Sequence, residues 1–282
     1  MSRRSDLALA RLWLVANLRL VLRAPRTAFF TFVFPLILLI LFDALKQSDV
    51  TFGGAKIPFV QFFTPSIAIF GLATATYTGL LFAVTTARDQ GVFKRVRGTP
   101  LPMRVFLGSW LGSTLLSGVA SVVLMLAVGV IAFGVHVYPR MLPAAFVTLV
   151  LGGAMLCALA LAVSSYIKRP ESAPVAANLT LFPLLFISGV FFPMDGEPDW
   201  LQKVARLFPL SHLTRAFEAC FSPHTQGSGF AGRDLAALAV WGIVGALVAV
   251  RRFSIETADG EESGARRLPL ARPQLVNTRR SR

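Results

Sequence analysis

Residues 106–133 read FLGSWLGSTLLSGVASVVLMLAVGVIAF, an apolar run without a single charged side chain. A bilayer core requires about 20 apolar residues per helix, so this run is long enough to cross a membrane. Further runs of this kind occupy residues 27–45, 61–86, 142–166, 174–192 and 234–250. Lipid cannot hydrogen-bond to open backbone groups, so these runs are expected to be helices. The sequence predicts an all-α integral membrane protein with six transmembrane helices.

Composition supports this class. The 282 residues are 55% hydrophobic and only 15% charged, whereas average proteins carry about 25% charged residues. The net charge of +14 is not evenly spread. If the N-terminus is cytoplasmic, the whole excess falls on the inner segments, as the positive-inside rule demands, and the outer segments balance. The charge therefore predicts cytoplasmic termini, and no loop is long enough to form a nucleic-acid-binding face.

The chain divides into one membrane domain with flanking segments. Residues 1–26 predict a cytoplasmic amphipathic helix whose cations face anionic membrane lipids. Residues 27–251 form the six-helix domain, and the polar stretch 252–282 predicts a disordered cytoplasmic tail. Between the fifth and sixth spans, residues 193–233 predict an extracytoplasmic hairpin of two short helices split by Pro209.

A short basic segment precedes the opening run. Residues 87–104, ARDQGVFKRVRGTPLPMR, hold five cations against one aspartate. This segment is too small to form a domain. We therefore expect its cations to meet a membrane surface or a partner protein.

Motifs for an energy source or for catalysis are missing. The sequence holds no G-x-x-x-x-G-K-[ST] phosphate-binding loop. Its three histidines, His136, His212 and His224, lack metal-ligand spacing. The span interiors hold essentially no ionisable residue, whereas ion-coupled carriers usually need one. The sequence therefore predicts neither an enzyme nor a metal protein, and uphill transport would need energy from another protein.

At this point two segments carry a resemblance to a known family. Residues 88–101, RDQGVFKRVRGTPL, are similar to an acidic-x-Gly…Arg…Thr-Pro-Leu signature, with Asp89 where a glutamate is expected. Residues 188–193, SGVFFP, followed by Trp200-Leu201 and Pro209-Leu210, resemble the stretch that closes the fifth span. Their order and spacing resemble the permease subunits of bacterial type-2 ATP-binding-cassette exporters, over roughly residues 5–252.

The resemblance implies a partner and a mechanism. A P-loop ATPase subunit would bind ATP and Mg, and this chain would hold no cofactor. A second permease protomer, a copy or a paralogue, would complete the transporter in the bacterial cell membrane. Residues 87–104 would form a helix docked on the ATPase, with coupling residues Arg88, Asp89, Gly91, Lys94, Arg95, Arg97, Thr99 and Pro100. The second and fifth spans would line the path, with Thr74, Thr78, Phe186 and Phe192 as candidate path residues.

Several functions remain open at this level. The first is export of an amphipathic drug, secondary metabolite or lipid-like molecule, because hydroxyls and aromatic rings suit such a substrate better than a small ion. The second is export of a lipid-linked polysaccharide or teichoic acid. The third is a non-transporting membrane assembly or immunity factor that uses the basic segment for docking. For the threonines, hydrogen bonds back to their own helix are the alternative interpretation.

Overall fold

The computed structural model describes residues 29–45, 49–52, 55–99, 103–167, 169–194, 198–223, 225 and 227–266, with side chains of the last helix only as far as Arg252. In this part the chain is almost entirely helical. The elements in chain order are η1 (Phe29–Val33), α3 (Phe34–Leu45), β1 (Asp49–Phe52), β2 (Ala55–Pro58), α4 (Phe59–Ala73), η2 (Thr74–Gly79), α5 (Leu80–Asp89), α6 (Val92–Arg97), α7 (Met103–Phe133), η3 (Pro139–Met141), α8 (Leu142–Ser164), η4 (Pro170–Ser172), α9 (Ala173–Ile187), α10 (Asp199–Ala205), α11 (Pro209–Ala219) and α12 (Gly232–Arg266).

Five helical stretches in the described residues are long and apolar enough to cross a membrane. They are Phe59–Asp89, Val105–Phe133, Pro139–Ser164, Pro170–Ile187 and Gly232–Arg252. A shorter apolar helix spans Thr31–Phe42, where the first span is predicted. The all-α membrane class is thereby confirmed. The total of six spans stays a prediction, because residues 27 and 28 lie outside the described part.

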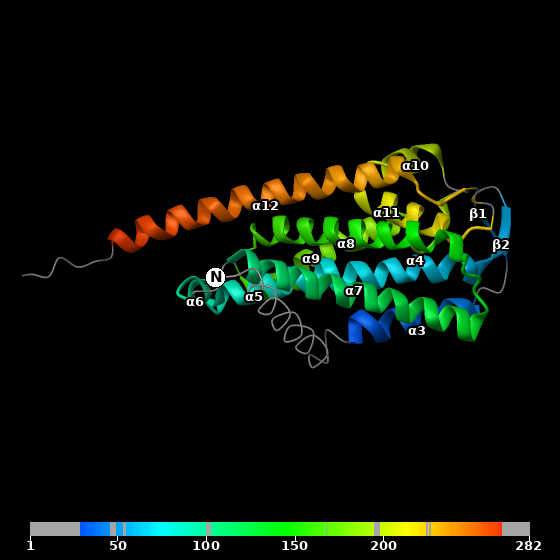
Figure 1. Cartoon of the computed structure of the whole chain (residues 1–282), viewed down its shortest axis with the longest axis horizontal. Helices are drawn as coiled ribbons and strands as arrows, with labels where there is room; N and C mark the ends of the chain where they lie inside the picture. Colours follow the sequence, from blue (N-terminus) through cyan, green and yellow to red (C-terminus); the bar gives the residue numbers. More distant parts are fainter. Residues whose placement is uncertain are drawn as a thin grey trace, which may run out of the picture.

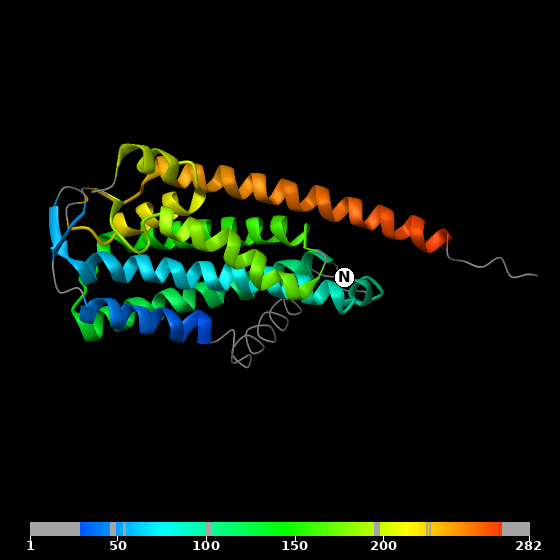
Figure 2. The ribbon, with the colours of Figure 1, turned by 180° about the vertical axis from the view of Figure 1, so that it is seen from behind.

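The helices form an elongated bundle with two different ends (Figure 1). The continuous stretch α4–η2–α5 is its most buried span. It packs against α3, α7, α8 and α11. The short helix α6 lies at one end, and the β1–β2 hairpin, α10 and α11 lie at the other, as both views show (Figure 2). The long helix α12 packs along α8.

Small residues on α7 allow the close approach of α4, as is common between membrane helices. A Cβ added at Gly118 would lie 2.8 Å from Leu72, and one at Gly129 would lie 2.4 Å from Thr64. The hydroxyl of Ser121 on the same helix donates to the carbonyl of Thr31, at 2.7 Å. The small-residue run of the third span therefore serves packing.

A buried glutamine joins three connections at the hairpin end. The Gln61 amide nitrogen donates to the carbonyls of His136 and Phe221, at 2.9 and 2.8 Å. Its oxygen accepts the backbone N–H of His136 at 2.8 Å. Gln61 is 6% exposed, and its bond to Phe221 is buried, whereas the two bonds to the backbone of His136 are only partly buried. These bonds hold α4, the α7–η3 connection and the end of α11 together.

The predicted hairpin helices are present as α10 and α11, and Pro209 begins the second, where a missing N–H does no harm. Three features differ from the sequence prediction. The β1–β2 pairing was not foreseen, because each strand is only four residues long. The fifth span ends at Ile187 and not at residue 192, because Gly189 turns the chain with a φ of 82°.

The third difference concerns the predicted disordered tail from residue 252. The structure continues α12 to Arg266. The reason lies in the sequence, because no proline interrupts the chain between Arg252 and Pro269. The predicted amphipathic helix of residues 1–26 lies outside the described residues.

Candidate coupling segment and substrate path

The basic segment begins with a sharp turn between α5 and α6. The N–H of Gln90 donates to Thr86 and that of Gly91 to Arg88, each at 3.0 Å. Gly91 has a φ of 67°, in the left-handed region that suits glycine. A Cβ there would meet no atom within 4 Å, so the requirement is one of backbone conformation and not of space. Gly91 therefore fixes the direction in which α6 leaves the bundle.

The apolar face of α6 packs against the start of α7. The ring of Phe93 lies 6.1 Å from that of Phe106 and 6.0 Å from that of Trp110, measured between centroids. Phe106 and Trp110 contact each other at 5.5 Å. Val96, on the same face of α6, is 7% exposed. A six-residue helix is unstable alone, so this aromatic cluster holds α6 in place.

The polar face of α6 points outward. Lys94 and Arg95 are both exposed, and so is Asp89 at the end of α5. Arg95 donates from Nη2 to the carbonyl of Gln90 at 3.0 Å, back over the turn. The hydroxyl of Thr99 donates to the carbonyl of Val96 at 2.7 Å and closes the far end of the helix. The side chain of Arg97 and all of Pro100 lie outside the described residues.

Arg88 is placed differently from the other predicted coupling residues. Its Nη1 donates to the carbonyls of Ser164 and Ile167, at 3.1 and 3.3 Å. These carbonyls lie at the last residue of α8 and three residues beyond it, where helix ends leave acceptors unpaired and favour a cation. Arg88 therefore ties the end of α5 to the end of α8 within the chain. Sequence reasoning assigned this cation to a partner and did not foresee the tie.

The two path threonines lie in η2, a π-helical turn in the middle of the most buried span. Thr74 is half-buried and donates to the carbonyl of Phe70 at 2.9 Å. Thr78 is half-buried as well. Between them, the hydroxyl of Tyr77 lies 2.8 Å from that of Thr180 on α9. This contact, which sequence reasoning missed, sets the register of the second span against the fifth.

The path phenylalanines lie nearer the hairpin end. Phe186 is 58% exposed, and its ring lies tilted against that of Phe191 at 4.9 Å between centroids; Phe191 in turn contacts Phe70 of α4 at 6.2 Å. Phe192 is 44% exposed and follows the end of α9. Phe186 is six residues beyond Thr180, or about 9 Å along the helix. The four predicted residues thus lie at two depths of the bundle and do not form one cluster.

Buried polar pairs at the hairpin end were also missed. Ser66 of α4 donates to Glu218 of α11, and His212 of α11 contacts Asp234 of α12 at 2.6 Å. The available sequence signal was Glu218, a carboxylate among apolar residues of a short helix. Its partner could not be named, because Ser66 is far away along the chain.

Comparison with known proteins shows which family the sequence matches. Residues 47–251 match the family model described as ABC-2 family transporter protein. The chain is 30% identical over 191 residues to the daunorubicin resistance ABC transporter permease protein DrrB1 of Streptomyces coeruleorubidus, covering 64% of each chain. It is 25% identical over 158 residues to the probable multidrug ABC transporter permease YbhR of Escherichia coli K12, covering 54% of this chain and 41% of the relative.

A third relative covers more of this chain. The chain is 26% identical over 210 residues to the putative transport permease ycf38 of Cyanophora paradoxa, covering 71% of this chain and 69% of the relative. The match spans just under two thirds of DrrB1 and about two fifths of YbhR. The family model covers most of the chain, from before β1 to the last span, and includes the basic turn and α6. This multi-pass membrane protein therefore belongs to the ABC-2 family of transporter permeases.

Proposed function

We propose that this chain is the permease subunit of an ATP-driven exporter and that α6 docks on a separate ATPase subunit, which binds ATP and Mg. The observation that carries the proposal is the construction of α6. Its apolar face is fixed to α7 by Phe93, and its cations Lys94 and Arg95 face outward at one end of the bundle. A helix held on one side and charged on the other suits an acidic protein groove.

The contacts of α6 also explain how movement reaches the membrane. Gly91 joins α6 directly to α5, Arg88 joins α5 to α8, and Phe93 joins α6 to α7. A displacement of α6 is therefore transmitted to three spans. ATP binding would shift the permease between two states by binding one of them more tightly. Small shifts are amplified because packed helices rearrange between discrete arrangements.

An amphipathic, drug-like molecule is the substrate class that we propose. The second span offers half-buried hydroxyls at Thr74 and Thr78, and the fifth offers the exposed rings of Phe186 and Phe192. The relative DrrB1 is named for daunorubicin resistance. Exposed apolar side chains also follow one stripe of α9, namely Val175, Leu179, Phe182 and Phe186. We place the second protomer and the path against this stripe.

The proposal is tested by purifying the tagged chain in mild detergent together with its candidate ATPase. The double variant Lys94→Glu/Arg95→Glu reverses both outward charges of α6. The matched control Lys203→Glu/Arg233→Glu reverses two exposed cations at the opposite end of the bundle. The wild type and the control should retain the ATPase and export a fluorescent amphipathic drug, while the α6 variant should lose both.

Two outcomes contradict this proposal. If the α6 variant retains both the ATPase and export, the cations do not dock a partner. If the wild type brings down no ATPase, the protein has no energy source. The observation would then favour an assembly factor. Membrane insertion of each variant is verified first, by fluorescence of a C-terminal fusion.

A further inference from the structure

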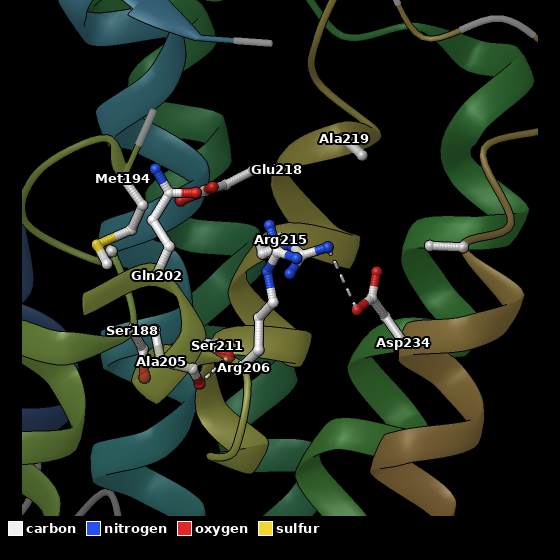
Figure 3. Close-up of a pocket in the computed structure, with 12 residues that line it drawn as sticks. Ser188, Met194, Gln202, Ala205, Arg206, Ser211, Arg215, Glu218, Ala219 and Asp234 are labelled. Atoms are coloured by element: carbon white, nitrogen blue, oxygen red, sulfur yellow. Dashed lines mark hydrogen bonds and ion pairs between the residues drawn. The ribbon is translucent and has the colours of Figure 1, made fainter. Parts of the chain in front are cut away.

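A cavity of about 330 Å³ with charged and apolar side chains in its walls lies at the hairpin end of the bundle, away from α6. Its walls come from the turn after α9, from α10, from α11 and from the start of α12. Figure 3 shows Met194 and Gln202 on one side, Asp234 on the other, and Arg206 and Arg215 reaching into the space between them. Nothing in the proposed transport path uses these residues.

Some hydrogen-bond donors that line this cavity have no acceptor in the part of the chain that the structure describes. Ser188 is 1% exposed, and its hydroxyl has no hydrogen-bond partner among the described residues. Within the same part of the chain, no carboxylate pairs with the guanidinium of Arg206. Arg215 forms an ion pair with Asp234 at 3.8 Å, a distance too long for a hydrogen bond, and its side chain is 45% exposed. The unpaired Ser188 hydroxyl and the two guanidinium groups line the same cavity, and an acceptor that bears negative charge suits these donors best.

The carboxylates that line the cavity are engaged elsewhere. Asp234 lies 2.6 Å from Nδ1 of His212, whose Nε2 lies 2.9 Å from the carbonyl of Arg206. The Asp234 carboxyl is therefore already engaged by the His212 ring. Glu218, 4% exposed, accepts from Ser66. Arg206 and the N–H groups of Arg215 that do not face Asp234 remain for a ligand.

The position of the cavity identifies the source of that ligand. It is lined by Ser188 and Gly189, directly after α9, and by Ala231 and Asp234, where α12 begins. The cavity thus lies at the level where two spans leave the bilayer. Beside it, Trp200 and Leu207 are 65% and 68% exposed. Exposed tryptophan and leucine next to arginine are typical of a surface at the headgroup level.

We propose that this cavity binds the phosphate of a phospholipid headgroup, with Arg206, Arg215 and Ser188 as the donors. Phosphate accepts hydrogen bonds on several oxygens, and arginine matches its geometry with two parallel N–H groups. The lipid's acyl chains would lie along Trp200 and Leu207. This site does not depend on the proposed docking of an ATPase, because it lies at the other end of the bundle.

Binding is measured with the full chain, delipidated in detergent, by titration with dihexanoyl-phosphatidylglycerol and thermal unfolding as the readout. Inorganic phosphate and octyl glucoside are titrated in parallel. Inorganic phosphate provides the anion without acyl chains, and octyl glucoside provides an alkyl chain without the anion. The variants are Arg206→Gln, Arg215→Gln and Ser188→Ala. Lys203→Gln is the matched control, because it removes an exposed cation of α10 that does not line the cavity.

The proposal predicts stabilisation by the phospholipid and not by octyl glucoside. Affinity should be at least about tenfold weaker in each arginine variant, since charge-assisted hydrogen bonds are the strong ones, and unchanged in Lys203→Gln. If inorganic phosphate stabilises the protein as much as the phospholipid does, the site binds a free anion, and the proposal that its ligand is a lipid is wrong. If octyl glucoside stabilises the protein as much as the phospholipid does, the proposal that the cavity recognises a phosphate group is wrong. If an arginine variant fails to fold, this headgroup comparison in the wild type still decides.

Discussion

Removing the anchor of α6 should uncouple the transporter without touching its outward charges. The substitution is Phe93→Ala, which deletes the ring that contacts Phe106 and Trp110 at 6.1 and 6.0 Å. An aromatic pair contributes about 0.5–1.5 kcal/mol beyond the burial of its area. Two pairs therefore amount to about 1–3 kcal/mol, before the lost burial is counted. That is a large share of what holds a six-residue helix on the bundle.

The expected result follows from this magnitude. About 1.4 kcal/mol corresponds to a tenfold change, so we expect drug export to fall by about tenfold or more. Lys94 and Arg95 remain in place, so the ATPase should still co-purify, and its ATP hydrolysis should no longer respond to the transported drug. The assay is drug efflux from reconstituted vesicles, with ATP hydrolysis measured in the same preparation.

The matched control is Phe82→Ala, which removes a 46% exposed ring from α5 without disturbing the α6 contact. It should export at close to the wild-type rate. Normal export by Phe93→Ala, at normal expression, would refute the reasoning, because α6 would then transmit movement without its anchor.

Three further predictions concern stability and reactivity. Gln61→Leu should lower the free energy of unfolding by about 1–3 kcal/mol, because the buried carbonyl of Phe221 loses its partner; thermal unfolding against the exposed-site control Gln90→Leu measures this. Gly129→Leu should lower it by about 1–3 kcal/mol through overpacking against Thr64, while Gly108→Leu, where a Cβ meets nothing, should not. Burial raises the pKa of the Cys220 thiol to about 11, and since the thiolate is the nucleophile, maleimide should label Cys220 at neutral pH only after denaturation, as peptide mass spectrometry will show.

Helix positions could be predicted from the sequence because an apolar run of about 20 residues can cross the bilayer only as a helix. Five predicted spans have counterparts, and four of these begin and end within about three residues of the prediction. The exception at the end of the fifth span arises from Gly189, whose positive φ stops the helix inside an apolar stretch. Composition alone does not reveal such a turn.

The candidate site was less predictable, because it depends on contacts between distant residues. The sequence marked residues 87–104 as a basic docking segment, and the structure shows which of these cations point outward. Arg88 looks the same as Arg95 in the sequence, yet it binds the end of α8, some 76 residues away in the chain. The cavity at the hairpin end has no motif at all, since four separate segments of the chain line it.

Photo-crosslinking from α6 tests the central claim most directly. A photoreactive amino acid, p-benzoylphenylalanine, replaces Lys94 in one variant and Lys203 in another, and both are irradiated in intact cells. The account predicts a covalent adduct with a P-loop ATPase from position 94 and none from position 203. If position 94 forms no such adduct, or if both positions form it equally, α6 is not the docking element and the proposed coupling is wrong.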